Sequence, residues 1–264
     1  MAENLLVFDV GTTGARSIVF NTEGREILKF YEEYPTERQP PGISEQDPLI
    51  WWDAIKKTCQ KVTKNKAINP KDISGICATF QRATVSIVDK KGEVLHPALT
   101  WMDEREVTTF KDFQEEGGLR RTIPKLLWLK NNRPNLFEKA DKIIFPDVYC
   151  YMKLCGEIVT DSTNGIWGII NMQSLKWDEK LAEVYELPVD LWPELHKHGE
   201  VIGELSGEAA DILGLKPGVP IILGGGDQQC AALGLGVINK GQAKVTQGTG
   251  TFIDYVVDAP IPPP

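Results

Sequence analysis

The sequence predicts an α/β fold, and three features of the chain point to it. β-rich runs separated by turn residues open the chain, a helix signal follows at 47–62, and an apolar strand pattern at 218–223 leads into another helix start. The hydrophobic share of 42% and the charged share of 25% are those of a globular protein, which excludes a disordered chain. We therefore expect a folded α/β domain.

The N-terminal elements follow from turn and capping residues. Three strands are expected over residues 5–8, 17–20 and 26–31. Asp47 and Pro48 then favour a helix start, because aspartate caps the first turn and proline fits it. Apolar residues at helical spacing continue to Val62 and would form the buried face of this helix.

The rest of the chain alternates between strand and helix patterns. Strands are expected over 73–80 and 84–88, with a turn at 89–92. The stretch 104–155 has a helical pattern and 156–215 is mixed. A buried strand at 218–223, bounded by three glycines, precedes a helix that starts near Asp227. Two further strands are expected over 242–247 and 252–257.

Charge and cysteine content restrict the partners and the compartment. Lys and Arg number 29 and Asp and Glu number 37, so the net charge is −8 and the chain lacks the basic character of a nucleic-acid binder. No apolar run approaches the roughly 18 residues of a membrane span, so no membrane partner is expected. The five cysteines are an odd number, and Met1–Asn4 carries no basic flank of a signal peptide. We expect a cytoplasmic protein with reduced thiols.

Two glycine-threonine turns could bind phosphate. Gly11, Thr12, Thr13 and Gly14 follow a strand that ends near Asp9, and residues 248–251 separate the last two strands. Small residues in a tight turn expose backbone N–H groups that suit phosphate oxygens. Asp9 could hold a divalent cation directly or through water. An ordinary hairpin turn is the alternative in both places.

A third glycine-rich turn is followed directly by the carboxylate residue Asp227. The glycines 224–226 separate an apolar strand from Asp227, at the strand end where open α/β sheets place ligands. Asp227 could accept the proton of an attacking hydroxyl, as the base of a kinase does. The alternative is that Asp227 caps the following helix.

The order of these turns resembles the FGGY family of sugar and polyol kinases. The segments that carry the resemblance are Phe8–Arg16, Glu45–Pro48 with Trp51 and Trp52, Thr122–Asn132, Gly226–Gln229 with Ala231, and Gly248–Gly250. They are similar to the first phosphate motif, the segment before the first long helix, the first signature pattern, the catalytic-base loop and the second phosphate motif of that family. Together they span nearly the whole chain.

The resemblance implies a ribonuclease H-like, actin-like ATPase domain with a mixed central sheet. Residues 1–258 would be the N-terminal, substrate-binding domain, and the Pro-rich residues 259–264 would begin a C-terminal half that the chain lacks. ATP and Mg²⁺ are the implied cofactors. Asp227 would be the catalytic base and Asp9 would help organise magnesium. The residues implied in ATP phosphate binding are Gly11, Thr12, Thr13, Gly14, Arg16, Gly248, Thr249 and Gly250. Arg16 has the alternative of a solvated hairpin charge.

The implied substrate residues are Gln81, Arg82, Trp101, Asp103 and Gln228. Arg82 stands where glycerol kinases have arginine, and its planar guanidinium could hold two hydroxyls. The neighbouring glutamate of glycerol kinases is Ala83 in this chain. Trp101 could face the substrate carbons, although core packing explains it equally. The pocket is therefore a hybrid, and a sugar or polyol is expected without the sequence specifying which.

The function expected from these residues is an ATP-dependent carbohydrate kinase, with a pentulose such as xylulose as the favoured acceptor. A glycerol kinase, a non-catalytic actin-like nucleotide-switch domain and an inactive sugar-binding relative are the alternatives. The 264-residue chain alone is expected to fold but not to phosphorylate sugar. The surface that would face the second half is expected to be apolar, which would allow a homodimer.

Overall fold

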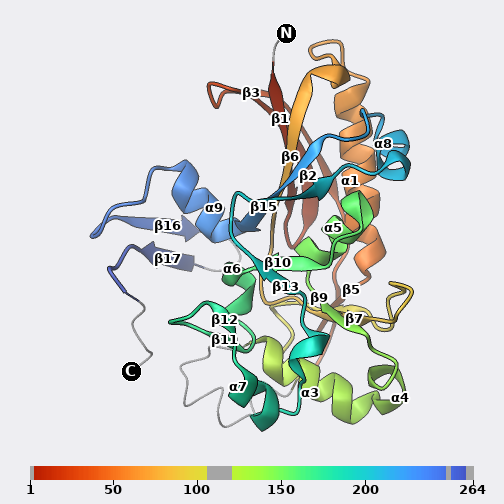
Figure 1. Cartoon of the computed structure of the whole chain (residues 1–264), viewed down its shortest axis with the longest axis vertical. Coiled ribbons are helices and arrows are strands. Elements are labelled where there is room, and N and C mark those ends of the chain that lie inside the picture. The colour runs from red at the N-terminus through yellow and green to blue at the C-terminus, as the bar shows by residue number, and fades with distance from the viewer. Residues whose placement is uncertain (1–2, 106–120, 248–250, 260–264) are drawn as a thin grey trace.

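The centre of the molecule is a mixed six-stranded sheet (Figure 1). The computed structural model describes residues 3–105, 121–247 and 251–259. The strands of the sheet are β1 (Asn4–Val10), β2 (Gly14–Asn21), β3 (Glu26–Glu33), β6 (Ile73–Phe80), β14 (Val201–Glu204) and β15 (Pro220–Gly226). Their order across the sheet is β14-β15-β6-β1-β2-β3.

The direction of the strands follows the connections between them. Short turns join β1, β2 and β3, which pair antiparallel as a meander. Longer connections return the chain to β6 and then β15, which run parallel to β1. β14 closes the other edge antiparallel to β15. The expected N-terminal meander and the mixed central sheet are both confirmed.

One long helix, α1 (Pro48–Thr63), covers the meander (Figure 1). Its start is the one predicted: the Asp47 side chain accepts the Leu49 N–H at 2.9 Å, and Pro48 occupies the first turn. The buried residues of α1 recur at helical spacing and face β2 and β3. Burial of this apolar face, more than intrinsic helix propensity, is what holds a helix of this length in place.

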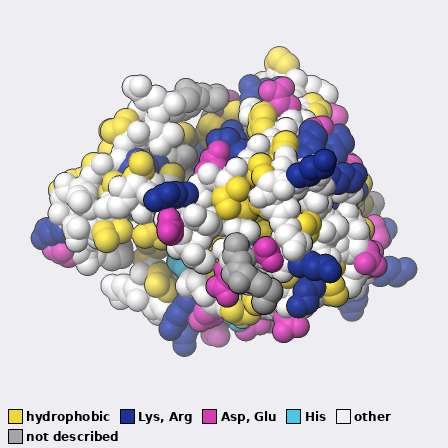
Figure 2. Space-filling model, turned by 90° about the horizontal axis from the view of Figure 1, so that it is seen from above, with side chains coloured by type: hydrophobic (Ala, Val, Ile, Leu, Met, Phe, Trp, Pro, Cys, Tyr) yellow, Lys and Arg dark blue, Asp and Glu magenta, His cyan; other side chains and the backbone are white. Residues whose placement is uncertain are grey.

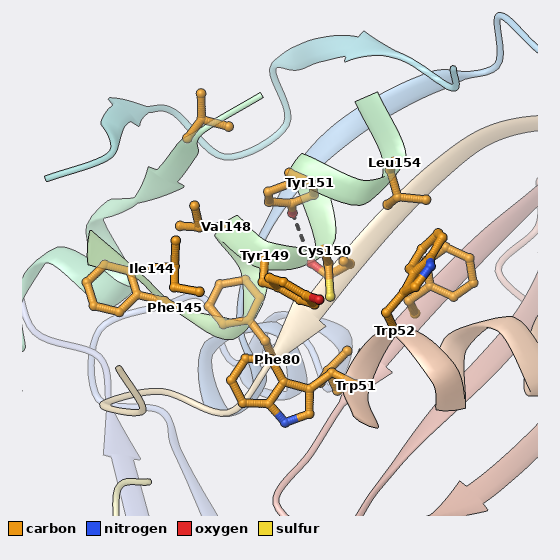
Figure 3. Packing of buried hydrophobic residues seen from close by; sticks show 14 of the residues in the cluster. Trp51, Trp52, Phe80, Ile144, Phe145, Val148, Tyr149, Cys150, Tyr151 and Leu154 are labelled. Atoms are coloured by element: carbon orange, nitrogen blue, oxygen red, sulfur yellow. Dashed lines mark hydrogen bonds between the residues drawn. The ribbon is translucent and has the colours of Figure 1, made fainter. Parts of the chain in front are cut away.

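The deepest part of the core lies between α1, β6 and α5 (Pro146–Cys155). Figure 3 shows Trp51, Phe80 and Tyr149 gathered there, contributed by these three elements. The rings of Trp51 and Tyr149 meet edge to face, with centroids 6.1 Å apart. Alternation along β1 buries Leu6, Phe8 and Val10 on the core face and leaves Asp9 on the opposite face.

The remaining elements are short. The helices are α3 (Thr122–Asn132), α4 (Pro134–Phe137), α6 (Ser162–Gly165), α7 (Glu179–Val184), α8 (Gly207–Leu213) and α9 (Asp227–Gly234), with 3₁₀ turns η1 (Pro70–Asp72) and η2 (Val189–Leu191). The small strands are β4 (Glu37–Gln39), β5 (Ile43–Gln46), β7 (Ser86–Val88), β8 (Ala98–Leu99), β9 (Lys142–Ile144), β10 (Val159–Asp161), β11 (Ile170–Asn171), β12 (Lys176–Trp177) and β13 (Glu194–His196). In the described ranges, no helix combines the length and the apolar character needed to cross a membrane.

The last hairpin, β16 (Ala243–Gln247) and β17 (Thr251–Tyr255), stands apart from the central sheet (Figure 1). The two strands pair with each other over their full length, as predicted from the sequence. In the space-filling view from above, basic and acidic side chains are interspersed among apolar ones, so one sign of charge does not cover this face (Figure 2).

Three local predictions need correction. The stretch 104–155, expected to be helical, contains strand β9, which pairs with β7; two apolar residues in a row do not distinguish a strand from a helix. Residues 106–120 of that stretch lie outside the described residues. β7 begins at Ser86, two residues later than expected. The glycines 224–226, expected to bound a strand, are its last three residues and pair along β6.

Candidate active site

The ends of three parallel strands form the floor of the candidate site. Val10 of β1 and Gly226 of β15 both lie in register with Phe80 of β6. The segments that follow these strands therefore meet at the carboxyl edge of the sheet, where open α/β sheets bind ligands. A cavity of about 210 Å³ opens there. Its lining residues are Thr12, Gln81, Arg82, Ala83, Trp101, Arg121, Trp167, Asp227, Gln228, Thr246 and Phe252.

The three glycines of β15 allow close contacts that a side chain would block. A Cβ on Gly224 would lie 1.8 Å from the Ala78 carbonyl oxygen, and one on Gly226 would lie 2.1 Å from Arg82 Cδ. Glycine at both positions lets β15 approach β6 and lets the Arg82 side chain pass over the strand.

Asp227 is the first residue of α9, directly after this glycine run. Gly226 occupies the N-cap position, so the alternative of Asp227 as a cap is not what the structure has. The Asp227 carboxylate accepts the Gln228 N–H at 2.8 Å and faces the cavity with 36% of its side chain exposed. Burial raises the pKa of Asp227, and the neighbouring Arg82 charge opposes that shift. A raised pKa makes a carboxylate a better proton acceptor near neutral pH.

Arg82 lies beside Asp227 without a direct hydrogen bond to it. Its Nε is 3.8 Å from Asp227 Oδ1, which makes an ion pair but exceeds hydrogen-bond distance. The guanidinium also lies 5.3 Å from the centre of the Trp167 ring. The side chain is only 11% exposed, so it is held in one place between a carboxylate and an indole.

Hydrogen bonds from residues outside the cavity hold Gly226, and thus the neighbouring Asp227, in place. The Gly226 N–H donates to the Thr163 hydroxyl at 2.8 Å, and that hydroxyl donates to Asp161 Oδ1 at 2.5 Å. The Asp161 side chain is fully buried, and burial raises its pKa. His198 Nε2 lies 3.5 Å from the same carboxylate. The strand end that carries Asp227 is therefore held by side chains from α6 and from the loop after β13.

The first glycine-threonine turn is tied to the core as well. Gln46 donates from Nε2 to the Thr12 carbonyl at 2.7 Å and accepts the Trp51 indole N–H at 3.0 Å. The Trp101 indole N–H donates to Thr12 Oγ1 at 2.8 Å, and the Trp101 ring meets the ring of Phe252 edge to face. Trp101 thus lines the cavity and also supports the turn, and it lies outside the buried core.

Asp9, Arg16 and Thr13 form a cluster on the outer side of this turn. Arg16 Nη1 lies 2.6 Å from Asp9 Oδ2, and its guanidinium lies 4.7 Å from the centre of the Tyr31 ring. Tyr31 Oη is 3.2 Å from the Thr13 hydroxyl. Gly14 is packed so closely that a Cβ would lie 2.5 Å from the Glu32 carbonyl oxygen. Gly11 closes the turn by donating its N–H to Gly14 O at 3.0 Å.

The carboxylates that the structure describes at the site are compatible with magnesium, which needs few protein ligands, and not with a metal held by protein side chains alone. In the part of the chain that the structure describes, no three His, Cys, Asp or Glu side chains gather into a metal-binding group. The charge of Asp9 contributes to the raised pKa of Asp227, after burial. Magnesium keeps several waters and is held by one or two carboxylates plus substrate phosphates. Asp9, which is paired with Arg16 in this structure, is the carboxylate that could hold such an ion.

The structure separates the expected substrate residues into two groups. Gln81, Arg82, Trp101 and Gln228 line the cavity, although Gln81 also donates to Gln46 Oε1 at 2.9 Å and Gln228 accepts from Lys244 Nζ at 2.7 Å. Asp103 does not line it. Its side chain is fully buried, forms an ion pair with Arg105 at 2.7 Å and accepts the Ser44 N–H at 2.9 Å, so it ties the segment after β8 to β5. Gly248, Thr249 and Gly250 lie outside the described residues.

A left-handed residue shapes the turn that carries Arg82. Ala83 has φ of +56°, and its carbonyl accepts a hydrogen bond from Lys125 Nζ at 2.7 Å. Lys125 is fully buried, and this desolvation lowers its pKa to about 7. The buried amine therefore stabilises the turn that leads from β6 into the cavity.

Sequence reasoning missed four lining residues: Arg121, Trp167, Thr246 and Phe252. Phe252 had a usable signal, because it directly follows the second glycine-threonine turn. Trp167 had none, since it follows a four-residue helix, α6, and reaches the cavity only through the tertiary fold.

Comparison with known proteins agrees with this geometry. Residues 4–234 match the model of the FGGY family of carbohydrate kinases, N-terminal domain. The glycerol kinase of Thermococcus onnurineus (strain NA1) is 33% identical over 266 residues, covering 94% of this chain and 53% of that protein. The xylulose kinase of Escherichia coli (strain K12) is 29% identical over 255 residues, covering 91% of this chain and 52% of that protein.

Solved structures give the same result. The crystal structure of gluconate kinase from Lactobacillus acidophilus superposes with a TM-score of 0.90 at 26% identity, covering 99% of this chain and 55% of that one. The chain spans about half the length of the relatives that it matches. The actin-like ATPase fold implied by the resemblance is thus confirmed. Both the sequence match and the arrangement of the strand ends lead to one conclusion: the chain belongs to the FGGY family of carbohydrate kinases.

Proposed function

We propose that this chain is the substrate-binding half of an ATP-dependent kinase that transfers the γ-phosphoryl group of ATP to a hydroxyl of a sugar or polyol. The observation that carries the proposal is Asp227, held at the end of β15 in a cavity beside Arg82. This cavity supports small-molecule chemistry over the alternative of a nucleotide-switch domain, which needs no pocket for a hydroxylated ligand.

Asp227 is the proposed base. Its carboxylate accepts the proton of the substrate hydroxyl, the hydroxyl oxygen bonds to the γ-phosphorus, and the bond to the bridging oxygen breaks so that ADP leaves. Arg82, Gln81, Gln228 and Trp101 hold the substrate in reach of both groups. Phosphoryl transfer depends mostly on such positioning and on charge stabilisation.

The nucleotide is proposed to bind between the two glycine-threonine turns. Gly11, Thr12, Thr13, Gly14 and Arg16 would contact its phosphates from one side, and Gly248, Thr249 and Gly250 from the other. Asp9 would hold Mg²⁺, which neutralises phosphate charge when bound.

A pentulose such as xylulose remains the favoured acceptor. The relatives include both glycerol kinases and xylulose kinases, so the family alone leaves the choice open. Ala83 supports a substrate other than glycerol, because the charged hydroxyl acceptor of glycerol kinases is missing next to Arg82. Glycerol kinase activity is the second candidate.

A C-terminal kinase domain is proposed to complete the site in the full-length protein. Residues 1–258 would be the N-terminal domain, and 259–264 would start the second. The coverage of about half of each relative supports this division. A cytoplasmic location is proposed on the sequence grounds given above.

The test is Asp227→Asn in the full-length protein, assayed with ATP, magnesium and a panel of pentuloses, hexuloses, sugar acids, polyols and glycerol. We expect kcat to fall by roughly 10²–10⁴ with much less change in substrate affinity, because the amide cannot accept the proton. Asp211→Asn, on the exposed face of α8, is the matched control and should leave kcat unchanged. Near-normal turnover by Asp227→Asn would remove Asp227 from the mechanism.

A further inference from the structure

We propose that Trp167 is a specificity-determining residue, whose indole N–H binds a carbonyl-type oxygen of the substrate together with Arg82 Nε. This inference rests on the proposed kinase function. It adds the substrate class: a sugar with a keto or carboxylate oxygen, in preference to the polyol of the same length. Two donors in one cavity have no acceptor among the residues that the structure describes.

Arg82 Nε and Trp167 Nε1 are both buried, and neither has a hydrogen-bond partner among the described residues. Both residues line the cavity at the strand ends. A buried donor without a partner is costly, so proteins rarely keep one unless a ligand or a bound water satisfies it. Two such donors at the wall of one cavity indicate a ligand that presents an acceptor there.

The other indoles show that this is particular to Trp167. The Trp101 N–H in the same cavity donates to Thr12 Oγ1 at 2.8 Å, and the Trp177 N–H outside it donates to the Pro193 carbonyl at 2.8 Å. The Trp167 backbone is fixed in a turn, because its N–H donates to the Asn164 carbonyl and its own carbonyl accepts from the Thr122 N–H, each at 3.0 Å. The backbone from which the indole projects is therefore held at the cavity wall.

A carbonyl oxygen satisfies this pair of donors better than a hydroxyl does. It has two lone pairs and no proton, so two N–H groups can saturate it. A hydroxyl in that place would also need an acceptor for its own proton. Asp227 is committed to the reacting hydroxyl, and Ala83 supplies no carboxylate where glycerol kinases have one. The positive charge of Arg82 adds to the attraction for an electron-rich oxygen.

The test compares substrates that differ only at this oxygen. Xylulose is paired with xylitol, and gluconate with glucitol, and all four are assayed with the full-length protein and with Trp167→Phe. Phenylalanine keeps an aromatic side chain beside Arg82 and removes the N–H together with part of the ring. The polyol of each pair controls for the lost volume, since that loss affects both members of a pair. Trp177→Phe, whose N–H already has an internal acceptor, is the matched control.

We expect the unchanged protein to prefer the carbonyl member of at least one pair. Trp167→Phe should lower kcat/KM for that member by about tenfold to a hundredfold, mainly through KM, and should change it less than about threefold for the matching polyol. A loss confined to xylulose identifies the bound oxygen as a keto oxygen, and a loss confined to gluconate identifies it as a carboxylate oxygen. Equal losses for both members of each pair, or a preference of the unchanged protein for the polyols, would overturn the proposal.

Binding keeps this test separate from the proposed function. If no compound of the wider panel named above is phosphorylated, the kinase proposal fails. Calorimetric affinities of these four compounds then decide the specificity proposal by the same ratios. A second measurement needs no substitution at Trp167. In protein with ¹⁵N-labelled indoles, the carbonyl substrate should shift one Trp indole signal that the polyol leaves in place, and unchanged indole signals would count against the proposal.

Discussion

The two glycine-threonine hairpins look alike in sequence, yet one is buried in the structure and the other is largely exposed. In β1–β2, the side chains of Leu6, Phe8 and Val19 are fully buried, and β3, β6 and α1 surround the hairpin. In β16–β17, Val245 is 59% exposed and Ile253 is 70% exposed. Within the described residues, these two strands pair only with each other. Turn chemistry predicts a hairpin equally well in both places, whereas burial depends on what the rest of the chain supplies.

The match to the family's N-terminal domain draws the same boundary. It ends at residue 234, before the second hairpin begins. The apolar side chains of β16–β17 thus lie beyond the body of residues 4–234 that the family model matches.

The largest expected contrast is in the contribution of apolar side chains to stability. Phe8→Ala should lower the free energy of unfolding of the 264-residue chain by about 3–5 kcal/mol, because it leaves a cavity under α1. Ile253→Ala should change it by less than about 0.5 kcal/mol, since most of that side chain is already in water. Urea denaturation measures both. A cost above 2 kcal/mol for Ile253→Ala would mean that the hairpin is buried in the isolated chain.

The same contrast explains what could be predicted from the sequence. The meander, α1 and the last hairpin follow from local turn, capping and spacing rules, and Asp47 caps α1 as expected. Asp227, Arg82 and Thr12 could be placed in one site because strand ends meet at one edge of a sheet. Trp167, and Thr163 with its hydrogen bond to Gly226, could not be placed there, because long-range packing brings them to the site.

Asp103 is a different case. The resemblance implied a substrate role for it, and the structure buries its side chain in an ion pair with Arg105, away from the residues that line the cavity. A sequence pattern carries the residue type but not the direction of the side chain. The strand β9 was missed for a related reason, since pairing with β7 selects its conformation.

The second prediction is that the pH dependence of the unfolding free energy comes from residues 4–234 and not from the β16–β17 hairpin. Burial raises the pKa of Asp147, at the start of α5, to about 8. The folded state then binds a proton that the unfolded state loses above about pH 4, so this contribution to stability is present below pH 4 and is lost as pH rises through 8. Between pH 5 and 7 the unfolding free energy should fall by about 1 kcal/mol per pH unit from this group.

Asp147→Asn should flatten that slope, because the amide keeps polar contacts with Thr160 and Asn164 but does not titrate. The window ends at pH 7 because Lys125, whose pKa burial lowers to about 7, makes stability rise with pH above that value. A chain that ends at residue 234 should show the slope of the longer chain. If the unfolding free energy of the shorter chain did not fall with pH, the pH dependence would come from the hairpin and not from the body.

The smallest expected effect concerns the contacts that tie the hairpin to the body. Lys244 of β16 has a 3% exposed side chain, and its Nζ lies 2.9 Å from Asp254 Oδ2 and 2.7 Å from Gln228 Oε1 on α9. Lys244→Met should cost no more than about 1 kcal/mol of global stability, since Asp254 is partly exposed and can be hydrated once the hairpin loosens. The effect should appear locally, as faster amide hydrogen exchange.

Hydrogen exchange followed by mass spectrometry can separate the two hairpins in one experiment. In Lys244→Met, exchange should accelerate by up to roughly fivefold in residues 243–255 and stay unchanged in β1–β2, because a loss of about 1 kcal/mol in local stability is a factor of about five in opening. Lys240→Met is the matched control: its partner Asp258 and Lys240 itself are both about two-thirds exposed or more, and such surface pairs contribute little. Equal acceleration in both variants would show that the hairpin is held by its own pairing alone. Acceleration that spread into β1–β2 would show that the hairpin and the body unfold as one unit, and the contrast between them would then describe burial but not cooperativity.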